Sequence, residues 1–311
     1  MICEICASVT SKSYTVKEQM FGFKDPFVYH ECSSCGCLQI DSVPDNLAKY
    51  YPPYYYAFTS AKPTLKRLPF FKRLVAEIRI KRKYQHNLVE LRYLKEIGTK
   101  VNEKILDFGC GDGSLICALF NQGFKNVEGV DMFLPNEIDH GYGVKVHKKE
   151  VSELPRNSYD LVMMHHVLEH MPFQKKALHD IYKVLKKDGC LMIRIPVLGY
   201  AWERYQENWV QLDAPRHLFL HTIKSMNLLA EDTGFTIGKT FFDSTSFQFL
   251  GSEIYEQGLP LCAKEDDYDF YSYSKQFSAE EIENFEKRAK VLNIEHRGDS
   301  AVFYLCKNKD V

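Results

Sequence analysis

A short glycine-rich segment in the middle of the chain constrains its fold more than any other feature. Residues 104–108 have the apolar character of a buried strand, and glycines follow at alternate positions, Gly109, Gly111 and Gly113. Glycine lets the backbone approach a ligand where a Cβ atom would collide. A helix is expected next, over 115–121. This order predicts an α/β domain with a doubly wound, Rossmann-like sheet, which binds its ligand at the carboxyl ends of the strands.

Two acidic residues narrow the choice of ligand. Asp107 lies just before the turn, where a carboxylate can reach a cationic amino group. Asp131 ends a second expected strand about 20 residues later, which suits hydrogen bonds to both hydroxyls of a ribose. A nicotinamide dinucleotide is the alternative, but its G-x-G-x-x-G pattern requires a glycine where this chain has Ser114. Asp107 would also repel a pyrophosphate, whereas it suits the positively charged end of S-adenosylmethionine.

These segments resemble the motifs of class I S-adenosylmethionine-dependent methyltransferases. ILDFGCGDGS, ending at Ser114, looks like the first motif, and EGVD, ending at Asp131, looks like the second. The likeness continues through 150–155, 159–170 and 184–193, and covers about residues 100–245 in the expected order. It implies a mostly parallel sheet with an antiparallel last strand. It also implies a set of cofactor-binding residues, namely Asp107, Gly109, Gly111, Gly113, Asp131, Met132, Glu150 and His165.

The first 45 residues predict a separate zinc-ribbon-like module. Cys3 and Cys6 form one C-x-x-C pair, and Cys32 and Cys35 form a second, which is the ligand spacing of a structural zinc site. Redox-active cysteines are the alternative. Four thiolates leave no open coordination position, so the expected role of the zinc is structural. A module of this size has too little core to fold unaided, and metal binding would supply the missing free energy.

The rest of the chain completes a three-part organisation. Residues 46–99 read as an aromatic linker, with a tyrosine-rich stretch at 50–56, followed by a basic helical segment. The tyrosines either pack the module onto the main domain or line a ligand platform. Residues 100–311 form the S-adenosylmethionine-binding domain. Within it, 246–299 is expected to be a helical insertion that serves as a lid or a dimer surface.

Two local signals mark the end of the chain. Ser278 with Glu281 three residues later has the pattern of a capping box and predicts the start of a helix. Residues 301–306 are apolar and predict the last strand.

The loop around Asp213–His217 is the expected acceptor site. His217 and His170 are the candidate catalytic bases, because an imidazole titrates near working pH. Arg216 is a candidate to bind a phosphate or carboxylate of the substrate. Tyr205 is a candidate to stack on a sugar ring, with core packing as the alternative. For His217 the alternative is a helix-capping or loop-structuring role.

Composition limits the classes of function. The formal net charge is −1, which gives no global case for nucleic-acid binding. No apolar run approaches the roughly 20 residues of a membrane span, and no signal peptide is evident, so a cytoplasmic location is expected.

A zinc-ribbon head on a methyltransferase domain resembles bacterial enzymes of sugar and surface-polysaccharide biosynthesis. That likeness implies O-methylation of a sugar, or of a nucleotide- or lipid-linked sugar. C-methylation of a keto-deoxysugar is one alternative. RNA methylation, with the zinc module contacting RNA, is another. A homodimer remains open.

Overall fold

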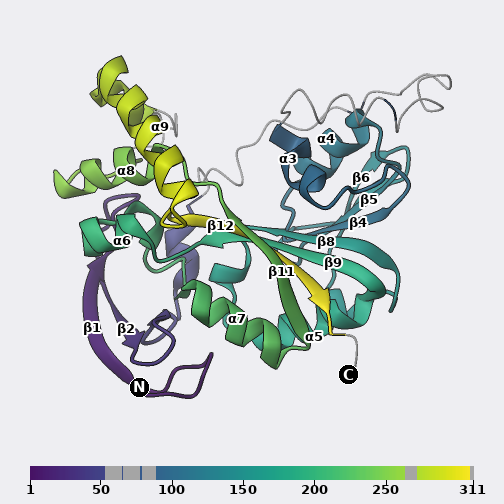
Figure 1. Ribbon diagram of the computed structural model, residues 1–311, viewed down its shortest axis with the longest axis horizontal. Helices are drawn as coiled ribbons and strands as arrows, with labels where there is room; N and C mark the ends of the chain where they lie inside the picture. The colour runs from purple at the N-terminus through teal and green to yellow at the C-terminus, as the bar shows by residue number, and fades with distance from the viewer. Residues whose placement is uncertain (53–64, 66–77, 79–88, 263–271, 309–311) are drawn as a thin grey trace. The chain divides into compact units, whose positions relative to one another are not determined.

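The chain forms two compact units in the computed structural model, which describes residues 1–52, 65, 78, 89–262 and 272–308 (Figure 1). The first unit comprises Met1–Tyr56, His166–Lys175 and Ile193–Leu305. The second comprises Ala57–His165, Lys176–Met192 and Cys306–Val311.

The second unit contains a mostly parallel sheet with helices on both of its sides. Its strand order is β9-β8-β4-β5-β7-β6; β4 is parallel to β5 and β8, β5 is parallel to β7, and β6 is antiparallel to β7. Figure 1 shows α3 and α4 on one side of these strands and α5 on the other. The predicted Rossmann-like α/β fold is thereby confirmed. The elements are α3 (Val89–Glu96), β4 (Lys104–Phe108), α4 (Ser114–Gln122), β5 (Asn126–Val130), β6 (Ile138–Gly141), β7 (Val144–His147), the 3-10 turn Val151–Glu153, β8 (Tyr159–His165), α5 (Gln174–Val184) and β9 (Leu185–Pro196).

Local sequence explains how β4 leads into α4. Ile105 and Leu106 in β4 are fully buried, so this strand lies in the core of the unit. Helix α4 then begins after Gly113 and buries Ile116, Leu119 and Phe120, which share one face because they are three and four residues apart. It ends at Gly123, whose φ of 118° is readily accessible only to glycine.

The first unit contains a four-stranded antiparallel sheet with the order β1-β2-β3-β10. The strands are β1 (Thr10–Lys17), β2 (Pro26–Cys32), β3 (Leu38–Ile40) and β10 (Phe219–Leu220). The pairing of Phe219 with Gln39 and of Leu220 with Leu38 joins distant parts of the chain. The sheet of the amino-terminal region therefore takes one strand from the loop in which we predicted the acceptor site.

The other described elements of the first unit are helices, strands β11 and β12 and the end of β9. Strands β11 and β12 are neighbours, and β12 also neighbours β9, which ends in this unit. Strand β12 contains the predicted last strand. The elements are the 3-10 turns Leu47–Tyr50, Leu168–His170, Gln206–Asn208, Val210–Leu212 and Ser272–Gln276, with α6 (Tyr200–Tyr205), α7 (Ile223–Asp232), β11 (Phe235–Phe242), α8 (Phe247–Glu256), α9 (Ala279–Ile294) and β12 (Ser300–Lys307).

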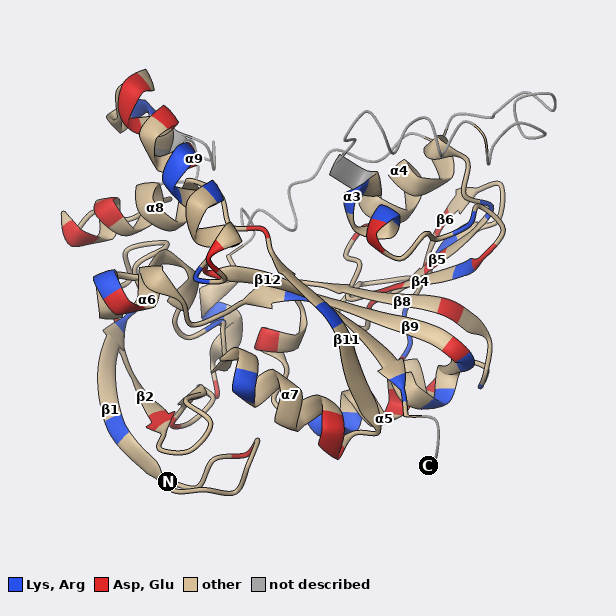
Figure 2. Ribbon diagram, in the orientation of Figure 1, with Lys and Arg blue, Asp and Glu red and all other residues tan. Residues whose placement is uncertain are grey.

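Helices α8 and α9 lie within residues 246–299. The Oγ of Ser278 accepts a hydrogen bond from the backbone N–H of Glu281, and the Glu281 carboxylate accepts one from the N–H of Ser278, which confirms the predicted cap. Glu280 and Glu281 place negative charge at the start of α9, where it interacts favourably with the positive end of the helix dipole (Figure 2). Both helices contribute to an apolar cluster that also contains Met20 and Phe21 of the amino-terminal region.

Two predictions fall largely outside the described residues. The tyrosine-rich stretch is described only to its third residue, and most of the basic helical segment lies outside. Of the tyrosines, Tyr50 is buried; its hydroxyl donates to Asp25 at 2.8 Å, and its ring meets Phe27 edge-on at 5.3 Å between centroids. Tyr50 therefore has the packing role rather than that of a ligand platform.

Candidate cofactor site, histidine cluster and cysteine cluster

The glycine turn of the second unit has the backbone geometry that its sequence predicts. Gly109, Gly111 and Gly113 have φ angles of 71°, 55° and 81°, in the left-handed region that favours glycine. At Gly113 a Cβ atom would also lie 2.6 Å from Cγ2 of Val146. Both the φ angle and the packing therefore require glycine at this position.

Asp107, in β4 just before the turn, is a buried carboxyl. Only 3% of its surface is exposed. Burial, together with the nearby charge of Asp131, raises its pKa to about 7. A carboxyl in this state gains from any cation bound beside it, because the cation stabilises the charged form.

Asp131 follows β5 and holds the turn in place. One carboxylate oxygen accepts from the N–H of Gly111 at 3.0 Å, and the other accepts from the N–H of Phe133 at 2.9 Å. Strand β5 also packs closely against the glycine turn, because a Cβ atom at Gly129 would lie 2.3 Å from Sγ of Cys110. Met132, the next residue after Asp131, is half exposed, with 50% of its surface accessible.

The remaining predicted cofactor residues belong to the same unit. Glu150 lies beyond β7 and caps the 3-10 turn that starts at Val151; its side chain is 49% exposed and pairs with Lys176 at 3.3 Å. His165 ends β8, and its ring lies 5.2 Å from that of Tyr93. Since β7, β5, β4 and β8 run parallel, their carboxyl ends meet at one edge of the sheet. All eight predicted cofactor residues come from this edge or from the loops and turns that follow its strands.

In the first unit, Arg216 has a different environment from the one that we predicted. Its guanidinium is fully buried and donates to both carboxylate oxygens of Asp213, at 2.9 and 2.6 Å. It also donates to Glu18 at 3.0 Å and to the backbone carbonyl of Tyr50 at 2.9 Å. These contacts do not support the prediction that Arg216 binds an anionic substrate, because the group faces internal carboxylates instead of solvent. Arg216 joins the amino-terminal region to the 213–217 loop.

His170 and His217 lie side by side in the same unit. Their rings meet edge-on with centroids 4.7 Å apart. Nδ1 of His217 lies 2.7 Å from the carbonyl oxygen of Gln211, and Nδ1 of His170 lies 2.9 Å from that of Arg216. A carbonyl only accepts, so both Nδ1 atoms carry the hydrogen, and in the neutral rings each Nε2 has a lone pair. The backbone thus selects one tautomer for both histidines.

Glu169 is the functional candidate that our sequence reasoning missed. Its side chain is fully buried, and Oε1 lies 3.2 Å from Nδ1 of His166. The other oxygen, Oε2, has no hydrogen-bond partner among the described residues. Burial alone would raise the carboxyl pKa, but the His166 hydrogen bond and the nearby His170 and His217 outweigh it and lower the pKa to about 2. The signal was visible in the sequence as an acid next to His170.

Tyr205 and the two tryptophans near it are core residues. The Tyr205 hydroxyl donates to Glu253 at 2.6 Å, and only 4% of the residue is exposed. Trp209 is fully buried and donates from Nε1 to Asp299 at 3.0 Å. Trp202 packs against Trp209 and Tyr14. The packing alternative is therefore supported, and this geometry does not support a sugar-stacking role for Tyr205.

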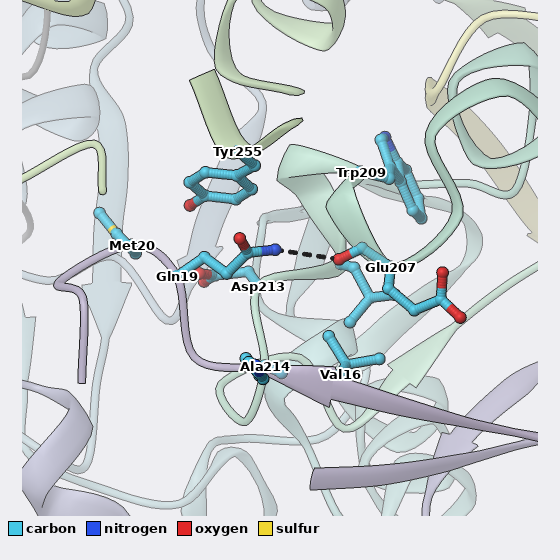
Figure 3. Close-up of a pocket in the computed structure, with 10 residues that line it drawn as sticks. Val16, Gln19, Met20, Glu207, Trp209, Asp213, Ala214 and Tyr255 are labelled. Atoms are coloured by element: carbon cyan, nitrogen blue, oxygen red, sulfur yellow. Dashed lines mark hydrogen bonds between the residues drawn. The ribbon is translucent and has the colours of Figure 1, made fainter. Parts of the chain in front are cut away.

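Figure 3 shows a pocket in the first unit, beside the 213–217 loop. Gln19 crosses it and donates from Nε2 to the carbonyl oxygen of Glu207 at 3.1 Å. Asp213 and Tyr255 form part of its wall. The space of about 180 Å³ includes open solvent at its mouth. It is smaller than the roughly 300–1,000 Å³ of most small-molecule sites, so we assign it no ligand.

The four amino-terminal cysteines form a cluster. Sγ of Cys3 lies 3.7 Å from Sγ of Cys35, Sγ of Cys6 lies 3.4 Å from Sγ of Cys32, and all four sulfurs lie within 4.8 Å of one another. Sulfurs bound to one tetrahedral zinc at about 2.3 Å would be separated by roughly 3.8 Å. Backbone N–H groups of Ser34 and Cys35 donate to the Cys32 sulfur at 3.4 Å each. The cluster therefore has the donor set and spacing that a zinc ion requires.

Comparison with known proteins places this chain among methyltransferases. Residues 76–239 match a family model described as a methyltransferase domain. The chain is 26% identical over 156 residues to phosphoethanolamine N-methyltransferase 2 of Caenorhabditis elegans, covering 47% of this chain and 35% of that protein. It is 31% identical over 114 residues to the ubiquinone biosynthesis O-methyltransferase of Salmonella paratyphi A, covering 33% of this chain and 47% of that protein. The chain thus spans less than half the length of both curated relatives.

One similar solved structure is phosphoethanolamine N-methyltransferase 2 of Haemonchus contortus, in complex with phosphomonomethylethanolamine and S-adenosylhomocysteine. The two chains are 20% identical; the match covers 71% of this chain and 52% of the other, with a TM-score of 0.44. No helix within the described ranges has both the length and the apolar character needed to cross a bilayer. Since the family model matches more than half of the sequence, the chain belongs to the methyltransferase-domain family.

Proposed function

We propose that this chain is an S-adenosylmethionine-dependent methyltransferase. When bound, S-adenosylmethionine supplies an electrophilic methyl group on a sulfonium. The chain's own residues would hold the cofactor at the carboxyl edge of the second unit. The family membership supports this activity, and so do the names of the curated relatives, all of which are methyltransferases.

The main observation in support of this proposal is the burial of the Asp107 carboxyl. Its carboxyl is buried beside Asp131, which raises its pKa to about 7. The amino group of S-adenosylmethionine is positive and would offset that cost, whereas a pyrophosphate would increase it. The residues also fit the rest of the cofactor, because Gly109, Gly111 and Gly113 have no Cβ atom that would block the close approach of a ligand. Asp131, which follows β5, would accept from the ribose hydroxyls, and Met132 and Glu150 would supply further contacts.

For the acceptor, we propose a hydroxyl group of a sugar or of a nucleotide- or lipid-linked sugar. An O-methyltransferase among the relatives supports an oxygen acceptor. The proposal of a sugar rests on the resemblance to bacterial polysaccharide-biosynthesis enzymes. The names of the curated relatives refer instead to phosphoethanolamine and to ubiquinone biosynthesis. C-methylation of a keto-deoxysugar and RNA methylation are the alternatives that the acceptor assay must separate.

We also propose that His217 or His170 acts on the acceptor. An attacking hydroxyl must lose a proton, and each of these imidazoles has a lone pair on Nε2 that can accept one. His217→Ala is expected to reduce turnover by roughly a hundred-fold and leave cofactor affinity unchanged. His170→Ala tests the second candidate in the same way.

Four cysteines, Cys3, Cys6, Cys32 and Cys35, are proposed to hold one structural zinc. The short sulfur separations and the N–H groups that donate to Cys32 support this assignment.

Calorimetry with S-adenosylhomocysteine tests the cofactor assignment. We expect binding to the wild-type chain, and binding at least several-fold weaker to Asp131→Ala, because two backbone N–H groups and the ribose lose their acceptor. Asp139→Ala is the matched control, since Asp139 is an exposed acid in the same unit. Binding of NAD in place of S-adenosylhomocysteine would overturn the proposal. Methyl transfer from labelled cofactor into a panel of sugar nucleotides, with RNA included, then identifies the acceptor.

A further inference from the structure

A second group of metal-type ligands lies in the first unit, apart from the four cysteines. Glu169, His170 and His217 each offer one ligand atom, and these three atoms lie within 4.8 Å of one another. Glu169 is fully buried and His217 is only 5% exposed. We propose that these three residues bind a divalent transition-metal ion, such as Zn²⁺.

The hydrogen bonds of both histidines prepare them as ligands. Nδ1 of His170 donates to the carbonyl of Arg216, and Nδ1 of His217 donates to the carbonyl of Gln211. Histidines that bind metals commonly donate their other ring N–H to a backbone carbonyl, which fixes the ring and directs the opposite lone pair to the ion. Here the same arrangement occurs twice in adjacent rings.

Glu169 supplies an independent indication of a missing partner. Its Oε2 is buried and has no hydrogen-bond partner in the described part of the chain. A charged oxygen without a partner in a protein interior is costly, and metal coordination is one of the few ways in which it is satisfied. Oε1 remains paired with Nδ1 of His166 at 3.2 Å, which would orient the carboxylate as a second-sphere contact.

The balance of buried charge also favours a dication. Glu18 and Asp213 both pair with the buried guanidinium of Arg216, and Glu169 is a third carboxylate in the same unit. Asp213 lies 3.8 Å from Nε2 of His217, so its charge is close to the proposed ion. Three carboxylates against one guanidinium leave an excess of negative charge, which a divalent ion would offset.

The donor set determines the class of ion and its chemistry. Two imidazole nitrogens and one carboxylate oxygen suit Zn²⁺ and its transition-metal neighbours, whereas Mg²⁺ and Ca²⁺ prefer oxygen. Three protein ligands leave a coordination position open to water or to an oxygen of the acceptor, in contrast to the closed cysteine site. In the metal-bound state both Nε2 lone pairs are ligands, so deprotonation of a hydroxyl would be assisted by the ion and not by a free imidazole. This last step rests on the proposed function, whereas the ion binding itself does not.

Metal content measured without any activity assay tests the site. Full-length protein is dialysed against Zn²⁺ and its metal content is measured by mass spectrometry. Wild type is expected to retain one zinc more per chain than Glu169→Gln, His170→Ala or His217→Ala. His179→Gln is the matched control, because it removes a solvent-exposed imidazole and should retain the wild-type amount.

The absorption spectrum of the Co²⁺-loaded protein distinguishes the loss of this one site from a failure to fold. Co²⁺-loaded wild type should show d–d absorption from a nitrogen and oxygen site in addition to thiolate charge-transfer bands. Glu169→Gln preserves the shape of the side chain and should lose only the first component. Equal zinc content in the wild type and all three variants, or Co²⁺ spectra that arise from thiolate ligands alone, would overturn the metal site. Either result would leave the methyltransferase proposal intact.

Discussion

At the scale of single residues, the partners of a buried charged group, and not its burial, distinguish Asp107 from Arg216. Asp107 is buried beside another acid, and its raised pKa shows the cost of that position. Arg216 is equally buried, but it is satisfied by Asp213 and Glu18. The sequence presents both as charged residues in promising loops. Only the tertiary contacts show that Arg216 is paired within the fold and joins two parts of it.

Asp107 should make the protein less stable as the pH rises. Its folded pKa of about 7 lies above the ordinary aspartate value of 3.8, so the fold favours the neutral form and stability is lost as the pH rises from 3.8 to about 7. Asp107→Asn keeps a neutral side chain. Its stability relative to wild type should therefore increase by about 2–3 kcal/mol between pH 5 and pH 8.5, measured by denaturant unfolding without cofactor. The same variant should bind S-adenosylhomocysteine more weakly; a stability difference that does not change with pH would contradict the assignment.

Arg216→Ala should lower the free energy of unfolding. Removing the guanidinium leaves the fully buried Glu18 and the partly buried Asp213 without this partner, and breaking a buried ion pair costs about 3–5 kcal/mol. Arg204→Ala is the control, since Arg204 forms an exposed pair with Glu256 and should cost less than about 1 kcal/mol. Thermal unfolding compares the two variants. An Arg216→Ala protein with wild-type stability and a raised KM for an anionic acceptor would restore the substrate-binding role.

At the scale of elements, the sequence predicts those structures that depend on interactions between residues close together in the chain. The strand–turn–helix around Gly109–Gly113 and the cap at Ser278 were predictable because each depends on residues within a few positions. The pairing of β3 with β10 was not, because Leu38 and Leu220 become neighbours only in the folded chain and a two-residue strand has no periodic pattern. The contact between Glu18 and Arg216 escaped prediction for the same reason.

Gly113→Ala should destabilise the second unit more than an equivalent change in an open position. At Gly113 the added methyl group meets Cγ2 of Val146 at 2.6 Å and the residue keeps a φ of 81°. Gly143 has a φ of 88° with no atom within 4 Å of the added Cβ, so Gly143→Ala measures the backbone cost alone, about 1–2 kcal/mol. The Gly113 variant should lose a further 1–3 kcal/mol, roughly the cost of overpacking. Equal losses in denaturant unfolding would show that Val146 moves away freely.

At the scale of the whole molecule, the amino-terminal region and the 213–222 segment form one compact unit. The Tyr29 hydroxyl donates to the carbonyl of His217 at 2.8 Å, and the Thr222 hydroxyl donates to the carbonyl of Cys35 at 2.6 Å. Strand β10, between these two points, pairs with β3. The cysteine cluster is therefore connected through the sheet to the loop that carries His217. Sequence patterns suggested two separate functions here, whereas the structure links them physically.

Zinc removal should consequently affect residues far from the cysteines in sequence. If the four cysteines hold zinc, its loss releases the knuckle at Cys32–Cys35, and the carbonyl of Cys35 no longer fixes Thr222. Amide hydrogen exchange after chelation should then accelerate in β3, which follows that knuckle, and in β10, which pairs with β3. Amides of β4 and β5 provide the internal control, since they belong to the other compact unit and should retain their protection. Cys32→Ser should reproduce the effect without a chelator. Unchanged exchange in β10 after complete metal removal would mean that the sheet holds its shape without zinc, and that the cluster does not support the 213–217 loop.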